Sequence, residues 1–470
     1  MPEKALEHRA RQLSYLTGKA HGLLTSKRTL KLLERAETDM PENPTQAANV
    51  RGLRRDIDRA TKLPQKLVEE ESQVCAMGKA AWVEARAKSD FALFAQHLEK
   101  ILTIARKKAD LFGYEGEPYD ALLDLYERGA KTREVAALFA KLRPQLAEIA
   151  REAVAKSKKV KPGVLKGRYP IEKQQILNRE IAESLGFDFG AGRIDTTAHP
   201  FCTTLGPGDV RLTTRYDERD FLSSLFGVMH ETGHGLYEQG LPGLDYGLPS
   251  GSAASLGIHE SQSRLWENQV ARGPGFWRHF GPRWRELFPA QTAGLSADDL
   301  ALVVAPVAPT LIRVEADEVT YNLHIVLRFE LERRLFAGDL DVEDLPEAWR
   351  ALSVELLGLA PAHAGEGVLQ DVHWGAGLFG YFPSYCLGNM IAAQLWARVR
   401  ALRPGIEEEF ACGDFSWLLA WLREHIHAAG RRHSALELVR AVTGEELSPQ
   451  HLVAYLRARY GALYLGGASC

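Results

Sequence analysis

The chain of 470 residues has few cysteines, no long apolar run and no large excess of charge. Its cysteines are odd in number, far apart and without a C-x-x-C pair: Cys75, Cys202, Cys386, Cys412 and Cys470. Disulfide-stapled secreted domains and cysteine zinc sites both need closely and regularly spaced cysteines, so neither class fits. The scatter instead predicts reduced thiols in a cytoplasmic protein.

No stretch reaches the roughly eighteen consecutive apolar residues of a membrane-spanning helix. The first residues, MPEKALEHRARQL, are charged and lack the apolar core of a secretory signal peptide. Lys and Arg total 58 against 61 Asp and Glu, a net charge of −3. Because this balance attracts neither nucleic acid nor anionic membranes, we expect neither as a partner.

Most of the sequence shows the spacing of apolar residues that is typical of amphipathic helices. Over residues 1–160, apolar residues recur three and four positions apart, with breaks at 40–44 and Pro64 and a stop at Gly113. Between 185 and 216 the chain is rich in Gly, Thr and Pro with short alternating runs, and helical spacing then resumes. These patterns predict a mainly α-helical fold with one small sheet.

No clean linker and no repeat of fixed period divides the chain, although its length allows two or three domains. We therefore predict a single unit over residues 1–470. Within it, 1–160 form a helical scaffold or lid, 185–390 carry the motifs described below, and 391–470 add C-terminal helices.

The most informative stretch is the pentapeptide HETGH, His230–His234. Histidines four apart on a helix project from one face, close enough to bind one metal ion. Neutral imidazoles suit zinc, and Glu231 beside the first histidine can act as general base toward a metal-bound water. The alternative is a surface helix with two histidines, because so short a match occurs in roughly a few per cent of unrelated chains of this length.

A zinc site of this type needs a third protein ligand. Glu260 is the first candidate, because it lies in a predicted helix, 252–270, that a turn-rich loop can fold back beside the first. The alternative is that Glu260 pairs with Arg264 four residues later. His259 and Glu267 are weaker candidates for the ligand position.

A strand is predicted just before the HETGH helix. Its apolar residues fall on one side and its polar residues on the other: Val210, Leu212 and Tyr216 against Asp209, Arg211, Thr213 and Arg215. We expect a substrate peptide to pair with Asp209–Thr213 main chain to main chain, as an added strand does. Asp217 is placed to cap the following helix, and Asp220 lies in its first turn.

Two further stretches carry polar residues of catalytic type. In a helix predicted over 309–335, Arg313 lies four residues before Asp317, which favours a structural ion pair over an anion site held rigid. In the glycine-rich stretch that follows 367, His373 and Tyr385 are donors suited to a developing oxyanion. Simple packing of the histidine and the aromatic rings is the alternative.

Taken together, these motifs resemble the carboxypeptidase Taq family of metallocarboxypeptidases. That family's patterns are HPF, D-x-R-x-T, H-E-x-x-H, H-E-[SG]-Q, [IV]-R-x-x-A-D and G-x-x-Q-D-x-H-W. In the same order, this chain has His199–Phe201, Asp209–Thr213, His230–His234, His259–Gln262, Ile312–Asp317 and Gly367–Trp374.

The resemblance implies a large two-lobed helical fold similar to neurolysin and angiotensin-converting enzyme, with a deep central groove and a small sheet beside the HExxH helix. It implies His230, His234 and Glu260 as ligands of one zinc ion per chain, for which cobalt can substitute. It also implies Glu231 as the base and Arg313 as the receiver of the substrate's terminal carboxylate. Family members are commonly homodimers.

The resulting prediction is a zinc carboxypeptidase that releases single C-terminal residues from peptides, with broad specificity and proline disfavoured. His373 and Tyr385 are expected to stabilise the oxyanion. Further substrate contacts are expected from His199, Asp209, Arg211, Thr213, Gln370, Asp371 and Tyr381.

Two other functions stay open on the sequence alone. An oligopeptidase that cuts internal bonds would cleave peptides with free and amidated carboxy termini equally well. A non-catalytic protein that binds peptides or stores metal would tolerate the loss of Glu231, whereas an enzyme would keep its metal and lose turnover.

Overall fold

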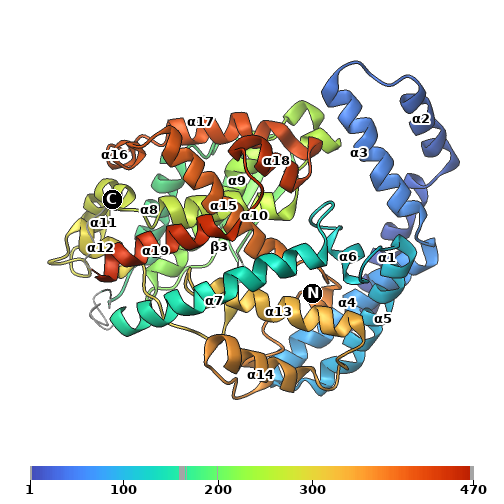
Figure 1. The fold of residues 1–470 in the computed structure, drawn as a ribbon, viewed down its shortest axis with the longest axis horizontal. Coiled ribbons are helices and arrows are strands. Elements are labelled where there is room, and N and C mark those ends of the chain that lie inside the picture. Colours follow the sequence, from blue (N-terminus) through green and yellow to red (C-terminus); the bar gives the residue numbers. More distant parts are fainter. Residues whose placement is uncertain (1–2, 158–164, 166, 198–199, 466–470) are drawn as a thin grey trace. The chain divides into compact units, whose positions relative to one another are not determined.

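The computed structural model describes residues 3–157, 165, 167–197 and 200–465, and the predicted mainly α-helical fold is confirmed (Figure 1). The helices are α1 Leu6–Leu24, α2 Lys27–Thr38, α3 Pro44–Thr61, α4 Gln65–Lys88, α5 Ala92–Phe112, α6 Tyr119–Leu123, α7 Thr132–Ser157, α8 Ile171–Ser184, α9 Phe221–Gly240, α10 Leu256–Arg264, α11 Pro274–Leu287, α12 Ala297–Val303, α13 Tyr321–Ala337, α14 Leu345–Leu357, α15 Pro383–Leu402, α16 Ile406–Ala411, α17 Ser416–His425, α18 Ala435–Thr443 and α19 Pro449–Leu465. Within these described stretches, no helix combines the length and the apolar character that crossing a membrane requires.

The chain divides into two compact units. Unit 1 comprises Met1–Arg143, Pro309–Ala316 and Thr320–Pro383, and unit 2 comprises Pro144–Ala308, Asp317–Val319 and Ser384–Cys470. The boundary inside α7 falls at Pro144, a proline in the body of the helix. Each unit consists of several separate segments of the chain, so the two units are not divided at one linker. Whether residues 1–470 act as one unit stays a prediction.

In unit 1, α1 packs along α4, and α4 packs along α5 (Figure 1). The breaks predicted here are confirmed. α2 ends at Thr38, and α3 begins at Pro44, where the side chain of Asn43 accepts hydrogen bonds from two backbone N–H groups of the first turn. α5 ends at Phe112 because Gly113 adopts a φ of +79°, a conformation that favours glycine.

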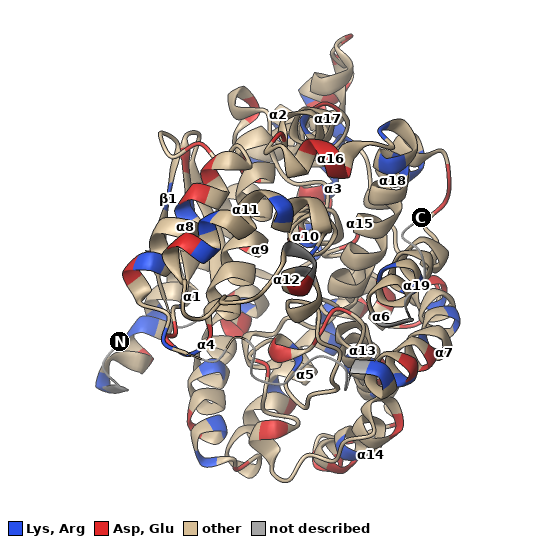
Figure 2. Cartoon of the chain, turned by 90° about the vertical axis from the view of Figure 1, so that its left-hand side faces the viewer, with Lys and Arg blue, Asp and Glu red and all other residues tan. Residues whose placement is uncertain are grey.

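Acidic and basic residues are interspersed along the helices in the view of Figure 2, in line with the small net charge. One local exception is the first turn of α16, which carries Glu407, Glu408 and Glu409. Carboxylates at a helix N-terminus are favoured by the helix dipole, so this group has a structural explanation.

The predicted small sheet lies in unit 2 and consists of β1 Gly192–Thr196, β2 Phe201–Gly206 and β3 Asp209–Thr214. The strand order is β1-β3-β2, with β1 parallel and β2 antiparallel to β3. Val210 and Leu212 are buried, as the alternating pattern predicts, but Thr213 of the predicted polar face is buried too, and Tyr216 lies beyond the end of β3.

The expected pairing of a substrate peptide with Asp209–Thr213 is wrong. β3 is the middle strand, so β1 and β2 already use the hydrogen-bonding groups on both of its edges. An added strand could pair only with the edge of β1 or β2 that faces away from β3.

Helix α9 lies against this sheet, with α10 beside it, and glycines permit both contacts (Figure 1). A Cβ atom on Gly235 would lie 2.8 Å from Leu212 of β3. A Cβ atom on Gly233 would lie 2.6 Å from Cα of Ser263 and 2.7 Å from the carbonyl oxygen of Gln262, both on α10. The glycine of HETGH therefore allows the backbone of α10 to approach the two histidines.

The N-cap of α9 is Asp220, whose carboxylate accepts a hydrogen bond of 3.1 Å from the backbone N–H of Ser223. The prediction that Asp217 caps this helix is therefore wrong. Asp217 instead accepts from the backbone N–H of Arg219 at 2.7 Å and so stabilises the turn before the helix.

The predicted helix over 309–335 is wrong in its first part. Arg313–Glu315 form a single 3-10 turn, and α13 begins only at Tyr321. The carboxylate of Asp317 accepts hydrogen bonds from the backbone N–H groups of Ala308 and Val319, which holds this segment as a loop. Arg313 and Asp317 therefore do not share a helix face.

Candidate metal centre

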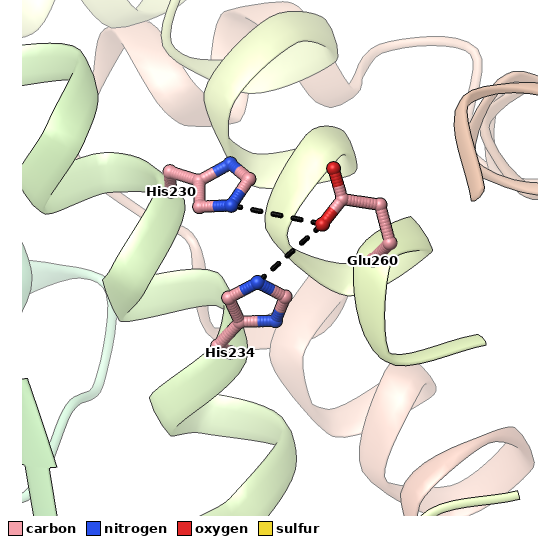
Figure 3. Close-up of side chains that lie close together, drawn as sticks. All are labelled: His230, His234 and Glu260. Carbon is pink, nitrogen blue, oxygen red and sulfur yellow. Dashed lines mark ion pairs between the residues drawn. The ribbon is translucent and has the colours of Figure 1, made fainter. Parts of the chain in front are cut away.

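His230 and His234 on α9 and Glu260 on α10 direct their side chains toward one point (Figure 3). Nε2 of His230 lies 3.7 Å from Oε2 of Glu260, and Nε2 of His234 lies 3.5 Å from the same oxygen. Two atoms about 2.1 Å from a tetrahedral zinc ion lie about 3.4 Å apart, so this spacing suits one metal ion. Across the described ranges, no other group of three His, Cys, Asp or Glu side chains meets at this spacing.

Glu260 uses its two carboxylate oxygens differently. Oε2 faces the two histidines, and Oε1 accepts a hydrogen bond of 2.7 Å from Nε of Arg264. The sequence alternatives for Glu260, metal ligand or partner of Arg264, are thus compatible in one geometry. Burial alone would raise the pKa of Glu260, but Arg264 and His230 hold it well below its usual range. Glu260 is therefore ionised, as a metal ligand must be.

The two weaker ligand candidates lie on the other side of the imidazoles. Oε2 of Glu267 is 2.9 Å from Nδ1 of His230, and Nδ1 of His259 is 2.6 Å from Nδ1 of His234. Arg264 also donates to Glu267 at 3.0 Å. Both candidates thus face the nitrogen atoms that point away from Glu260.

The protonation of His234 suits metal binding. Burial lowers its pKa to about 3, and the neighbouring His259 adds to this effect. For His230, burial acts in the same direction, but Glu260 and Glu267 outweigh it and raise the pKa. His234 is therefore neutral near pH 7, the form in which imidazole binds metal.

Glu231, the proposed base, is 6% exposed, and its Oε2 atom has no hydrogen-bond partner among the described residues. An unsatisfied buried oxygen is costly unless a ligand or water meets it. Burial raises the pKa of Glu231 to about 7. A carboxylate with this pKa can both accept and return a proton near neutral pH, which fits a general base next to a metal-bound water.

Arg313 is buried in unit 1, and its partner is Asp371, so the predicted ion pair with Asp317 is wrong. Nη2 and Nε of Arg313 donate to Oδ1 of Asp371 at 2.7 and 3.1 Å, and Nη1 donates to the hydroxyl of Tyr321 at 2.8 Å. The reason is the loop conformation of 309–320, which removes the helical spacing on which the Asp317 pairing depends.

A second arginine, Arg328 on α13, completes this cluster. It donates from Nε to Oδ2 of Asp371 at 2.7 Å and from Nη2 to Oε1 of Gln370 at 2.7 Å. The same Gln370 oxygen accepts the backbone N–H of Arg313 at 2.9 Å. Burial would raise the pKa of Asp371, but Arg313 and Arg328 hold it far below its usual range. One ionised carboxylate thus faces two fixed guanidinium groups.

The predicted oxyanion donors belong to different units. His373 of unit 1 is buried and packs against the rings of Tyr381 and Phe382, with centroids 5.2 and 4.4 Å away. Burial lowers the pKa of His373 to about 3, so its imidazole is neutral and can donate one N–H. Tyr385 lies on α15, in unit 2, and is partly buried.

Three of the remaining predicted substrate residues, Asp209, Arg211 and Thr213, lie on β3 in the sheet of unit 2. Arg211 donates two hydrogen bonds, of 2.8 and 2.9 Å, to its neighbour Asp209, and both side chains are partly exposed. The hydroxyl of Thr213 donates to the carbonyl of Phe201 at 3.1 Å and accepts its N–H at 2.9 Å, which ties β3 to β2. His199 lies outside the described residues.

Arg328 contacts Asp371 and Gln370, and Oε1 of Glu238 lies 2.8 Å from Nε2 of His259, yet neither residue belongs to any of the motifs. Each lies one helical turn after a histidine, Arg328 after His324 and Glu238 after His234. Residues four apart on a helix share a face, and that spacing is the signal that identifies them.

Comparison with known proteins agrees with this geometry. A family model described as carboxypeptidase Taq (M32) metallopeptidase matches residues 1–460. Thermostable carboxypeptidase 1 of Thermus thermophilus is 45% identical over 476 residues, covering 99% of this chain and 93% of that protein. Carboxypeptidase 1 of Bacillus subtilis is 38% identical over 468 residues, with 99% and 93% covered. The crystal structure of an M32 carboxypeptidase from Deinococcus radiodurans R1 superposes with a TM-score of 0.94 at 41% identity, covering 99% of this chain and 93% of that one.

Proposed function

Since the chain belongs to the carboxypeptidase Taq (M32) metallopeptidase family and is a metal-dependent carboxypeptidase, we propose that zinc is its metal and that His230, His234 and Glu260 are the ligands. The observation that carries this proposal is the convergence of two imidazole nitrogens on one carboxylate oxygen, at 3.7 and 3.5 Å. Two histidines and one glutamate leave the fourth tetrahedral position to water, as in other catalytic zinc sites.

Glu231 is the general base of the proposed mechanism. Zinc bound here would polarise the scissile carbonyl and acidify a water molecule. Glu231 accepts the proton of that water on its unpaired Oε2 and later passes it to the leaving amine. The proposed oxyanion donors are His373 and Tyr385, and donors of this kind contribute about 3–4 kcal/mol each in other hydrolases.

Arg313 is the proposed receiver of the substrate's terminal carboxylate. Its guanidinium is fixed by Asp371 and the Tyr321 hydroxyl, so it loses little conformational freedom when it binds an anion. Asp371 also neutralises Arg328, which leaves the two cations with a single carboxylate between them. These contacts support the second of the two interpretations drawn from the sequence, in which Arg313 is a rigidly held binding site for an anion.

The other proposed substrate residues divide by what their side chains already contact. Gln370 and Asp371 are engaged with Arg313 and Arg328, so we assign them to holding Arg313 in place. Tyr381, Arg211, Asp209, Thr213 and His199 stay proposals for contacts along the peptide. Broad specificity with proline disfavoured is part of the same proposal.

A pair of matched peptides tests the reaction. One peptide carries a free carboxy terminus, and the other has the same sequence with an amidated terminus. We expect the zinc-loaded protein to release one C-terminal residue from the first and to leave the second intact. Equal internal cleavage of both would refute the carboxypeptidase assignment in favour of an oligopeptidase. A panel of free peptides that differ only in the last residue measures specificity, with proline expected to be the slowest.

A homodimer in the cytoplasm is the proposed state of the protein. Helix α1 exposes Tyr15, Leu16 and Leu23, at 67%, 56% and 64%, which is an apolar surface of the kind that subunits bury. Light scattering of the purified protein gives the oligomeric state, and a Leu16→Asp variant should shift it toward monomer. The location rests on the scattered cysteines alone.

A further inference from the structure

We propose that His259 and Glu238 form a relay that fixes the imidazole of His234 and thereby sets the affinity of the protein for its metal. The proposal rests on the ligand role proposed above for His234. His259 and Glu238 are positioning residues in this scheme, because neither faces the point on which the three ligands converge.

The relay consists of three consecutive short contacts within unit 2. Nδ1 of His234 lies 2.6 Å from Nδ1 of His259, and Nε2 of His259 lies 2.8 Å from Oε1 of Glu238. The other oxygen of Glu238 accepts a hydrogen bond of 2.6 Å from the hydroxyl of Thr204. Because Glu238 and His234 are on α9, His259 is on α10 and Thr204 is on β2, the relay connects three elements around the metal centre.

The chemistry of the donors and acceptors gives the relay a direction. A metal can bind His234 only through an unprotonated Nε2, so the hydrogen of the neutral ring lies on Nδ1 and is donated to His259. Nδ1 of His259 then accepts, and its own hydrogen lies on Nε2 and is donated to Glu238. A carboxylate only accepts, and Glu238 therefore ends the relay and selects the tautomer of both rings.

The other proposed histidine ligand, His230, contacts a carboxylate with no residue in between. Nδ1 of His230 meets the carboxylate of Glu267 directly, at 2.9 Å. A histidine ligand that donates its second N–H to a carboxylate is held in one orientation and becomes a stronger base toward the metal. At His234 the carboxylate is one imidazole farther away, so the same effect depends on the correct placement of His259.

The ring of His259 is itself held by packing. It lies between His234, with ring centroids 4.5 Å apart, and Tyr237, with centroids 5.2 Å apart. The hydroxyl of Tyr237 accepts the backbone N–H of Ala254 at 3.1 Å, in the loop that leads into α10. This packing limits the rotation of the ring, and the hydrogen bond to Glu238 then decides which nitrogen faces His234.

Two substitutions at one position separate a hydrogen-bond role from a packing role. His259→Leu removes the acceptor that faces His234, whereas His259→Asn replaces it, because the Asn carbonyl oxygen occupies nearly the place of Nδ1. Zinc affinity is measured by competition with a chromophoric chelator at one fixed pH. We expect His259→Leu to weaken zinc binding by about 10- to 100-fold and His259→Asn by only a few-fold.

A matched control comes from His451, whose Nε2 lies 3.0 Å from Glu445 in the same unit. His451→Leu removes a histidine–glutamate pair of similar length away from the ligands and should leave zinc affinity unchanged. Thermal unfolding of each metal-free variant should stay close to that of the metal-free parent. If His259→Leu and His259→Asn bind zinc equally well, the relay is refuted.

A double-substitution cycle tests the part played by Glu238. Glu238→Leu should weaken zinc binding in the parent protein but have no further effect in the His259→Asn background, because Asn does not reach Glu238. Additive losses would show that Glu238 acts independently, and the relay would be overturned. Failure of the parent protein to bind zinc would instead refute the proposed metal site, so the two proposals fail in different ways.

The absorption spectrum of the cobalt-loaded protein gives a readout that does not depend on turnover. Loss of the relay changes the orientation of one imidazole ligand, so His259→Leu should shift the visible bands of bound cobalt and His259→Asn should not. Identical spectra for all variants would contradict the proposed positioning role.

Discussion

Gly233→Ala should separate the three proposed metal ligands without removing any of them. The new Cβ atom would lie 2.6 Å from Cα of Ser263, 2.7 Å from the carbonyl oxygen of Gln262 and 3.0 Å from the backbone nitrogen of Ser263. All three atoms belong to the backbone of α10, so no side chain can rotate away to relieve the contact. α9 and α10 must therefore move apart, and Glu260 moves away from His230 and His234.

The size of the effect follows from these distances. A comfortable carbon–carbon contact is about 3.5–4.0 Å, so the helices must separate by about 1 Å. Overpacking of this kind costs about 1–3 kcal/mol, and a helical Gly→Ala change returns about 1 kcal/mol through helix propensity. A displacement of about 1 Å at a catalytic centre lowers turnover by about 100-fold.

Gly227→Ala is the matched control, because it lies on the same helix and its Cβ atom would meet only the hydroxyl of Thr214, at 3.2 Å. Both variants share the propensity gain, so their difference isolates the clash with α10. Urea unfolding of the metal-free proteins should show Gly233→Ala less stable than Gly227→Ala by about 1–3 kcal/mol. Chelator competition should show weaker zinc binding only for Gly233→Ala. Equal stability and equal zinc affinity of the two variants would refute the close approach of α9 and α10.

Three further outcomes are expected. Glu231→Gln should keep its zinc but lose turnover by about 10²- to 10⁴-fold, and an active Glu231→Gln would remove the proposed base. Asp371→Asn leaves Arg313 and Arg328 without their shared carboxylate and should destabilise the metal-free protein by about 3–5 kcal/mol in urea, whereas a change below about 1 kcal/mol would show that water already screens the pair. Burial raises the pKa of Glu332 from 4.5 to about 7. Its contribution to stability is therefore complete below about pH 4.5 and is lost as the pH rises through about 7, by up to about 3 kcal/mol. A Glu332→Gln variant should lack this pH dependence in unfolding experiments, and an unchanged profile would show that Glu332 ionises normally.

The helical regions and the two proposed histidine ligands are the parts of this protein that local sequence spacing predicts. Apolar residues three and four apart define one face of a helix, and two histidines four apart define one side of a metal site. For these features the interacting residues lie within about one helical turn of one another. Their relative positions therefore follow from their spacing in the sequence. Glu260 needed more, because the turn-rich loop only allows its helix to lie beside the first, and the family resemblance was required to choose Glu260 as the third ligand.

The interactions of Arg313 illustrate why the other features of the fold and the site were not predictable from the sequence. Its spacing to Asp317 is that of a helical ion pair, yet the segment folds as a loop, and the true partner, Asp371, lies 58 positions later. The strand predicted over Asp209–Tyr216 was confirmed up to Thr214, where β3 ends. Its central place in the sheet was not predicted, because strand order depends on which other segments pair with it. Backbone hydrogen bonds on both edges then exclude the expected pairing with substrate.

The sequence by itself thus determined the helical class and the family, and it indicated HETGH as the candidate metal site. It did so because helix periodicity and ligand spacing are short-range properties. The tertiary structure alone decided that Gly233 lets α10 reach the histidines, that Asp371 holds Arg313 and that His259 connects His234 to Glu238. Each of these contacts joins residues far apart in the chain, and only the packing of whole helices brings them within hydrogen-bonding distance.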